Sequence, residues 1–421
     1  MKLTFGFGKG TQEVDVSKRL LLGELHANPV TVELTEEEEL RRALASPIGA
    51  PPLSELVHPG EKIVLVTSDI TRPMPTWKVM PALLDLLYGA GCAPSDITLV
   101  FALGSHRHQT DEEKRHLAGE RAWSEIRCID SDPEDCVLLG TTSAGTPVAV
   151  TRTVAEADRV ICLGNIEYHY FAGYSGGAKA IMPGCSTPEA IQANHSMMVR
   201  PECCAGSLEG NPLRADIEEA GRILGIDYIV NVVLSEHKEI LRAVAGDPVL
   251  AHREGCRFLD SLYLKELPAP ADIVIVSQGG APKDLNLYQT QKALDNAAHA
   301  VRDGGAIILI GSCAEGLGSA VFEEWMNDAK RPEDLIERVR TNFRLGGHKA
   351  AAIAMVLRRA AVFLVSDLPD ETVRNCFLTP AKSARAALRE ARKLVGADAK
   401  ILAMPYGGST LPKVREAEQR R

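Results

Sequence analysis

The stretch KIVLVTSDI (62–70), followed by PTWKVMPALLDLLYGAG (75–91), decides the fold class. The first segment is a nearly continuous run of Val, Ile and Leu, which indicates a strand buried on both faces, as in parallel sheets. The second segment is long and apolar enough to form a helix that covers such a sheet. The same order recurs where DITLVFALGSH (96–106) precedes TDEEKRHL (110–117). This alternation of buried strands and helices predicts an α/β fold.

Further apolar runs continue the pattern to the end of the chain. They are DRVICLGNIE (158–167), DYIVNVVLS (227–235), ADIVIVSQGG (271–280), GAIILIGSC (305–313), AVFLVSDL (361–368) and AKILAMPYGG (399–408). The segment KELPAPAD (265–272) places two prolines between a helix and a new strand, which is typical of a domain boundary. We therefore expect two α/β domains with largely parallel sheets, 1–265 and 266–421, and the active site in the cleft between them.

Composition narrows the class of protein. The chain has 421 residues and a net charge of -9, which argues against a nucleic-acid binder because such proteins usually display a basic face. No apolar run reaches the roughly 18 residues of a membrane span, and the N-terminus lacks a signal-peptide pattern. The ten cysteines contain no C-x-x-C pair, which is typical of reduced thiols. We expect a cytoplasmic protein that binds neither nucleic acid nor a membrane.

Four clusters of polar residues follow the predicted strands, where parallel α/β folds place their chemistry. They are TSDITRPMP (67–75), ALGSHRHQT (102–110), GNIEYHYFAGYSGGAKAIMPGCSTPEAIQANH (164–195) and PKDLNLYQTQKALDNA (282–297).

The first two clusters offer an arginine and a histidine. Arg72 precedes Pro73, so its backbone is extended, and a guanidinium there is suited to bidentate binding of a carboxylate. His106 follows small residues at a strand end and is suited to proton transfer near neutral pH. An exposed arginine and a hydrogen-bonded loop histidine are the plainer interpretations. His108 is expected to face solvent.

The third cluster contains GYSGGAK (173–179), which is not a Walker A motif because Ala178 and Ala180 stand where Gly and Ser or Thr are needed. It predicts a glycine-rich turn that opens a helix at AKAIMPG (178–184), with backbone amides suited to an anionic group. Lys179 fits a phosphate ligand, a Schiff-base lysine or a covalent attachment point. A solvated helix lysine fits the same pattern.

Five further residues are ambiguous when taken one at a time. His169 is flanked by two tyrosines, and stacking on their rings would be enough to account for it. His195 lies at the end of a helix that is expected to start at residue 187 or 188. Tyr288, Gln289 and Lys292 fall within one predicted helix, where Gln289 and Lys292 share a face. An amphipathic surface helix explains them equally well.

In their joint order and spacing, these clusters resemble the nickel-dependent lactate racemase family, whose members are nickel-pincer-nucleotide racemases and epimerases of 2-hydroxy acids. The resemblance covers the whole chain and is carried by SDITRP, LGSHR, HYFAGYSGGAK, ANH, LYQTQK and the closing ILAMPYGGSTLP. One departure is Ala178, where family members often carry Arg, and this puts in doubt how the cofactor phosphate is held.

The resemblance implies a role for each residue. The catalytic residues would be His106 and His169, and the metal ligand would be His195. The cofactor would be bound by Lys179, Asp69, Thr71, Ser175, Gly176 and Gly177. The substrate would be bound by Arg72, Tyr288, Gln289 and Lys292.

The resemblance also implies the cofactor and the reaction. The cofactor would be a pyridinium-3-thioamide-5-thiocarboxylic acid mononucleotide that carries nickel and is joined covalently to Lys179. Sulfur donors in a planar arrangement suit Ni(II). The enzyme would be an isomerase that inverts C2 of a 2-hydroxy acid by proton-coupled hydride transfer through a 2-keto acid. Proteins that make and load the cofactor would be its partners, and a homo-oligomer is compatible with the sequence.

Other functions remain open at this point. The same cofactor would serve malate, an aromatic or longer 2-hydroxy acid, or a sugar acid epimerised at C2. A pyridoxal-phosphate enzyme would use Lys179 as a Schiff base, and a cofactor-binding protein without turnover would use the same pocket. A zinc hydrolase is disfavoured because no H-E-x-x-H motif occurs.

Overall fold

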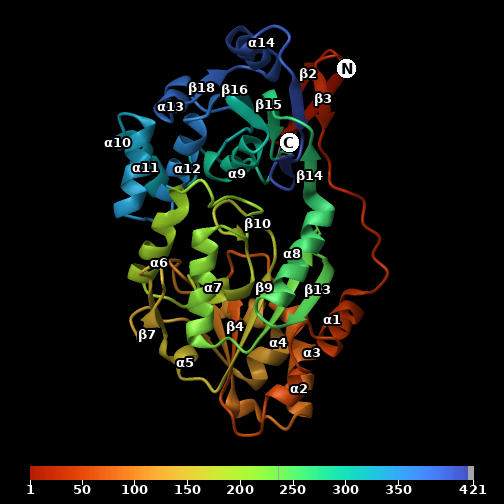
Figure 1. Ribbon diagram of the computed structural model, residues 1–421, viewed down its shortest axis with the longest axis vertical. Helices are drawn as coiled ribbons and strands as arrows, with labels where there is room; N and C mark the ends of the chain where they lie inside the picture. Colours follow the sequence, from red (N-terminus) through yellow and green to blue (C-terminus); the bar gives the residue numbers. More distant parts are fainter. Residues whose placement is uncertain (236, 416–421) are drawn as a thin grey trace, which may run out of the picture. The chain divides into compact units, whose positions relative to one another are not determined.

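The computed structural model describes residues 1–235 and 237–415, and its fold is α/β as expected (Figure 1). The chain forms two compact units. The middle unit is Val30–Ser261, and the terminal unit combines Met1–Pro29 with Leu262–Arg421. The break after Ser261 lies near the boundary expected at residue 265. The first 29 residues, however, group with the C-terminal part of the chain rather than with the N-terminal domain.

The middle unit is built on a six-stranded sheet with the order β13-β12-β9-β4-β5-β6. All neighbouring strands are parallel except β13, which runs antiparallel to β12. The strands are β4 (Ile63–Ser68), β5 (Ile97–Ala102), β6 (Arg127–Asp130), β9 (Arg159–Asn165), β12 (Tyr228–Leu234) and β13 (Ile240–Gly246). These runs correspond to the apolar segments that the sequence marks as buried strands.

Helices and two short hairpins complete the middle unit. The helices are α1 (Glu36–Ala45), α2 (Leu53–Leu56), α3 (Thr76–Gly89), α4 (Asp111–Glu125), α5 (Arg152–Ala155), α6 (Pro188–His195), α7 (Pro212–Leu224) and α8 (Leu250–Tyr263). The hairpins are β7 (Cys136–Thr141) with β8 (Pro147–Thr151), and β10 (Tyr168–His169) with β11 (Gly173–Tyr174). The 3-10 helices are η1 (Pro94–Asp96), η2 (Gly177–Ala180) and η3 (Ser196–Val199).

The core of this unit explains why the sheet is so apolar. Leu83, Leu84 and Leu87 of α3 pack in one buried cluster with Ile63 and Leu65 of β4. Each side chain of this size gains about 1.5–3 kcal/mol from burial. The sheet is therefore a rigid base, and the polar residues just past its carboxyl edge are held in fixed places.

The terminal unit has its own six-stranded sheet, with the order β18-β17-β16-β15-β19-β3 and every pair parallel. The strands are β3 (Leu21–Glu24), β15 (Ala271–Ser277), β16 (Val301–Ile310), β17 (Ala360–Val365), β18 (Thr379–Ala381) and β19 (Ile401–Met404). Because β3 pairs with β19, the start of the chain supplies an edge of this sheet, which is why it belongs to the terminal unit.

The remaining elements of the terminal unit surround that sheet. They are the hairpin β1 (Lys2–Phe7) and β2 (Gly10–Asp15), the pair β14 (Leu264–Leu267) and β20 (Leu411–Val414), and the helices α9 (Leu287–Ala298), α10 (Ala320–Asp328), α11 (Pro332–Thr341), α12 (Gly347–Leu357), α13 (Asp370–Asn375) and α14 (Ala384–Val395). Helices α10, α11 and α12 gather together, and β2 lies beside α14 (Figure 1).

Two expectations drawn from composition can be compared with the structure. All ten cysteines are free thiols and most are buried, as expected for reduced side chains. Among the described residues, no helix has both the length and the apolar character that a membrane crossing requires.

Candidate active site

Asp69 and His106 form a hydrogen-bonded pair at the carboxyl edge of the middle sheet. Asp69 follows β4 and His106 follows β5, and these neighbouring parallel strands bring both residues to the same edge. Oδ2 of Asp69 lies 2.6 Å from Nδ1 of His106. The other carboxylate oxygen accepts hydrogen bonds from the Thr71 hydroxyl at 2.7 Å and from the Thr71 amide at 3.2 Å. His106 therefore carries a proton on Nδ1, and its Nε2 lone pair is available to act as a base.

The charge state of Asp69 supports this assignment. Burial alone would raise the pKa of the carboxyl group, which is only 2 % exposed. The hydrogen bond and charge of His106, the hydrogen bond from Thr71 and the charge of Arg72 outweigh burial and lower the pKa of Asp69 below its usual range. Asp69 is thus a carboxylate at neutral pH. Arg72 itself is exposed.

A glutamine holds the loops that carry this pair. Oε1 of Gln109 accepts a hydrogen bond from the amide of Ile70 at 2.8 Å, and Nε2 of Gln109 donates to Asp130 at 3.0 Å. Gln109, in the loop after β5, thereby joins the loop after β4 to the end of β6. His108 lies in the same loop with a side chain that is 71 % exposed, so its expected position facing solvent is confirmed.

Phe171 lies between three of the residues singled out in the sequence. Its ring centroid is 4.4 Å from that of His169 and 5.0 Å from that of His195, with edge-to-face geometry in both pairs. Nζ of Lys179 lies 5.6 Å from the same ring. Because Phe171 is buried, it fixes the spacing of two imidazoles and one amine that come from three different segments.

The backbone fixes the protonation of His169. The amide of Ala172 donates a hydrogen bond to Nδ1 of His169 at 3.3 Å, and the imidazole stacks on Tyr170 with an interplanar angle of 16°. A nitrogen that accepts a hydrogen bond carries no proton, so the neutral ring has its proton on Nε2. This is the opposite tautomer to that of His106.

The glycine-rich turn before Lys179 differs in part from expectation. Gly176 and Gly177 have φ angles of 78° and 60°, which side chains other than glycine rarely adopt. The turn opens only the 3-10 helix η2, not the α-helix expected over 178–184, because Pro183 lacks the amide that a longer helix needs. The amide of Gly177 donates to Oδ1 of Asn231 at 2.8 Å, so it is not available to an anion as the sequence suggested.

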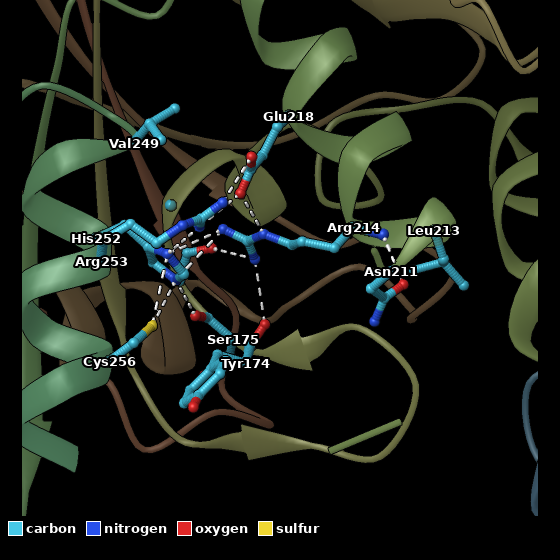
Figure 2. Close-up of polar contacts among 12 residues, drawn as sticks. Tyr174, Ser175, Asn211, Leu213, Arg214, Glu218, Val249, His252, Arg253 and Cys256 are labelled. Atoms are coloured by element: carbon cyan, nitrogen blue, oxygen red, sulfur yellow. Dashed lines mark hydrogen bonds and ion pairs between the residues drawn. The ribbon is translucent and has the colours of Figure 1, made fainter. Parts of the chain in front are cut away.

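A buried arginine and a buried histidine hold the backbone of this turn (Figure 2). Nη1 of Arg214 donates to the carbonyl of Tyr174 at 3.2 Å, and Nε donates to Glu218 at 2.7 Å. Nε2 of His252 donates to the carbonyl of Ser175 at 2.8 Å, and Nδ1 of His252 accepts from Nη2 of Arg214 at 3.1 Å. Burial and the charge of Arg214 keep the pKa of His252 well below its usual range, so the ring is neutral.

These charges act on Lys179. Glu218 also accepts a hydrogen bond from Arg253 at 2.8 Å, so one carboxylate pairs with two guanidinium groups behind the turn. Burial, followed by the charges of Arg72 and Arg214, lowers the pKa of the Lys179 amine well below its usual range. The lowered pKa favours the neutral form of the Lys179 amine, which is the nucleophilic form.

His195 is the last residue of α6, and this helix begins at Pro188 as the sequence predicts. The side chain is buried, and its Nδ1 lies 3.0 Å from Oδ1 of Asn194. Ala178, where the sequence departs from the family pattern, is buried close to Gly221 of α7.

The other predicted substrate residues lie in the terminal unit, on the first turns of α9. Gln289 and Lys292 are not buried, whereas Thr290, Gln291 and Ala293 between and beside them are. The two side chains therefore share the outward side of this helix, as their spacing predicts. The ring of Tyr288 contacts those of Phe322 and His348 edge-on, at 6.1 and 6.4 Å between centroids.

Several residues that support the site were missed in the sequence. They are Gln109, Phe171, Asn194, Arg214, Asp216, Asn231 and His252. Each comes from a helix, strand or loop whose local pattern is ordinary. Only the fold shows that they contact the glycine turn, the catalytic loops or a functional imidazole.

Comparison with known proteins agrees with these observations. Residues 7–206 match the model of the lactate racemase N-terminal domain, and residues 267–411 match that of the lactate racemase C-terminal domain. Proteins named lactate racemase from Thermoanaerobacterium thermosaccharolyticum and Lactiplantibacillus plantarum are 34% and 32% identical, each over 97% of this chain and 98% of its own length. A solved lactate racemase apoprotein from the first organism superposes with a TM-score of 0.89 and 33% identity, covering 99% of this chain and 100% of its own. The chain belongs to the lactate racemase family.

Proposed function

We propose that the protein is an isomerase that interconverts the enantiomers of a 2-hydroxy acid, with lactate as the first substrate to test. Family membership supports the reaction class, and relatives of nearly equal length are named lactate racemase. The observation that carries the proposal is the pair of imidazoles with opposite tautomers, His106 and His169, in one unit with the buried Lys179 amine, whose pKa is lowered.

The two histidines divide the proton transfers. His106 has its lone pair on Nε2 and accepts the hydroxyl proton of one enantiomer, while Asp69 stabilises the imidazolium that forms. His169 has a proton on Nε2 and donates it to the oxygen of the flat 2-keto acid when the opposite face reacts. In the reverse direction the two residues exchange these tasks. A racemase needs one proton-transfer group for each enantiomer, and this arrangement supplies both.

Cations orient the substrate. Arg72 is an exposed guanidinium next to the Asp69 and His106 pair, which suits it to bind the substrate carboxylate. We also assign Gln289, Lys292 and Tyr288 of the terminal unit to substrate binding, as the family resemblance implies. Carboxylate binding leaves the carbinol carbon as the part of the molecule that is presented for reaction.

The residues of the middle unit fit the nickel-pincer nucleotide. The Lys179 amine, whose pKa is lowered, suits a covalent link, and His195 suits a metal ligand. Ser175, Gly176 and Gly177 would shape the turn that receives it. When bound, the group supplies an electrophilic carbon that accepts and returns hydride. Asp69 and Thr71, which the family pattern assigns to the cofactor, also hold His106.

A deuterium experiment tests the proposal. Cofactor-loaded protein would be incubated in D₂O with each enantiomer of lactate, malate, an aromatic 2-hydroxy acid and a sugar acid, and the products separated by chiral chromatography. We expect at least one acid to reach the same mixture from both enantiomers with its C2 hydrogen retained, because hydride does not exchange with solvent. Deuterium at C2 would overturn hydride transfer. No interconversion of any acid would overturn the proposed function.

The histidine variants test the division of proton transfers. His106→Ala and His169→Ala should each slow interconversion by about 10²–10⁴-fold, the usual contribution of a general acid or base. Full activity in both cofactor-loaded variants would contradict the scheme.

A further inference from the structure

A buried hydrogen-bond chain behind His195 fixes which ring nitrogen carries the proton. The chain runs from Thr142 and Thr146 through Asp216 and Asn194 to the imidazole. Asn194, Asp216 and Thr146 are each 2 % exposed or less. Because these groups are out of reach of solvent, their donors and acceptors must match one another.

The outer end of the chain has only one consistent arrangement. The hydroxyl of Thr142 accepts a hydrogen bond from the amide of Thr146 at 3.0 Å and donates its own proton to Oδ1 of Asp216. The hydroxyl of Thr146 donates to Oδ2 of Asp216 at 2.8 Å. Both oxygens of Asp216 are therefore acceptors, as a carboxylate requires.

The orientation of the Asn194 amide follows from this. Its nitrogen lies 2.7 Å from Oδ2 of Asp216 and 3.3 Å from the carbonyl of Leu213. Both are acceptors, so the NH₂ group must face them, and the reversed amide would place its oxygen against a carboxylate. The amide oxygen Oδ1 consequently faces His195. An amide oxygen only accepts hydrogen bonds, so Nδ1 of His195, at 3.0 Å, must be the protonated nitrogen.

We propose that Asn194 and Asp216 are positioning residues that hold His195 as the Nδ1–H tautomer, with the Nε2 lone pair directed to nickel. This inference rests on the proposed function for the identity of the metal. A metal-binding histidine usually donates its second nitrogen to a carboxylate or carbonyl, which fixes the ring and raises the basicity of the ligand. Here that acceptor is an amide oxygen, and the carboxylate lies one step behind it.

Phe171 completes the support of the ring. Its edge-to-face contact with His195, at 5.0 Å between centroids, restricts rotation about the side-chain bonds while the hydrogen bond to Asn194 sets the direction of Nδ1. The ligand is thus oriented by one apolar and one polar contact before any metal arrives.

The tautomer can be measured in the apoprotein without cofactor or metal. Two-bond ¹H–¹⁵N NMR spectra of the full chain labelled with ¹⁵N-histidine distinguish a pyrrole-type from a pyridine-type nitrogen, and the signals lost in His195→Gln assign this residue. We expect a pyrrole-type Nδ1 and a pyridine-type Nε2. A pyrrole-type Nε2 for His195 would overturn the inference, whatever the activity of the enzyme.

Metal retention gives a second, independent readout. Asn194→Leu keeps the approximate volume of the side chain and removes its amide. Asn296→Leu is the matched control, because Asn296 is also buried and its side-chain amide donates to the Gly407 carbonyl at 2.7 Å, in the terminal unit. In each loaded protein, intact mass gives the adduct at Lys179 and elemental analysis gives nickel per chain.

The two measurements separate this inference from the proposed function. We expect Asn194→Leu to keep the adduct and to bind nickel about 10–100-fold more weakly during dialysis against a chelator, while Asn296→Leu behaves like the wild type. Nickel retention equal to the wild type in Asn194→Leu would overturn the positioning role. A wild-type chain without adduct or nickel would overturn the proposed function, and the NMR result would still decide the tautomer.

Discussion

Nδ1 of His106 lies 2.6 Å from Oδ2 of Asp69, and this pair joins the ends of two adjacent parallel strands. The carboxylate is buried and ionised, so it selects the tautomer of the imidazole and compensates the charge that appears when His106 takes up a proton. The sheet thus brings the two loops together, and the hydrogen bond to Asp69 sets the direction of the His106 base.

The first prediction concerns this pair. Asp69→Asn removes the negative charge with little change in volume, so it should lower kcat by about 10²-fold or more because His106 loses both its orientation and its charge compensation. Steady-state kinetics on the cofactor-loaded variant measure the effect. The control is His108→Ala, which alters an exposed imidazole in the same loop and should leave the rate within about two-fold, on the scale of ordinary surface substitutions. Equal rates in Asp69→Asn and the wild type would contradict the assignment.

The second prediction concerns the glycine turn. A methyl group at Gly177 would lie 2.9 Å from Nη2 of Arg214, in addition to the strain of a φ angle of 60°. Gly177→Ala should therefore destabilise the apoprotein by more than the about 1–2 kcal/mol of a left-handed alanine. Gly210→Ala is the matched control, because Gly210 has a φ angle of 76° with no atom within 4 Å of the added methyl group.

Urea unfolding of the two glycine variants and the wild type provides the comparison. The loss of unfolding free energy in Gly210→Ala measures the backbone strain alone. The additional loss in Gly177→Ala measures the clash of the new methyl group with the side chains of Arg214 and His252. Equal losses of unfolding free energy in the two variants would show that the Arg214 and His252 side chains can move aside for the methyl group without cost.

The third prediction concerns the amine of Lys179. Burial and neighbouring cations lower the pKa of Lys179 in the folded chain. At pH values between that lowered pKa and the usual value of about 10.4, Lys179 is protonated in the unfolded chain and neutral in the folded chain. The contribution of Lys179 to the free energy of unfolding therefore rises with pH over that interval. Lys179→Met should be more stable than the wild-type apoprotein at pH 7, and the difference should shrink as the pH approaches 10.

Urea unfolding at several pH values measures this difference. The free-energy difference between the variant and the wild type is the relevant quantity, because other titrating groups cancel in it. A difference that stays constant from pH 7 to pH 10 would mean that Lys179 is an ordinary, protonated lysine.

Sequence patterns predicted the fold class and the strands well because a strand buried on both faces leaves a continuous apolar run, as in Ile63–Ser68 and Ala271–Ser277. These patterns could not assign the first 29 residues to the terminal unit. That assignment depends on the pairing of β3 with β19, which joins parts of the chain more than 300 residues apart. The helix expected over 178–184 was also wrong, and η2 ends at Ala180.

The candidate site was likewise predicted only in part from the sequence. Histidines and the lysine were recognised because their motifs resemble those of a known family, and the residues that orient them were not. Arg214 and His252 are separated by 38 positions and meet only through the packing of α7 and α8 near the turn. Asn194 stands beside His195 in the sequence, but its role depends on Asp216, which only the fold brings near.

Intact-mass and peptide-mass measurement of protein matured with its cofactor-synthesis enzymes shows whether Lys179 carries the cofactor. We expect one nucleotide adduct located at Lys179 together with nickel in the wild type, and no adduct in Lys179→Arg, whose guanidinium cannot form the same link. An active wild-type protein whose Lys179 is unmodified, or whose adduct lies on another lysine, would contradict this assignment.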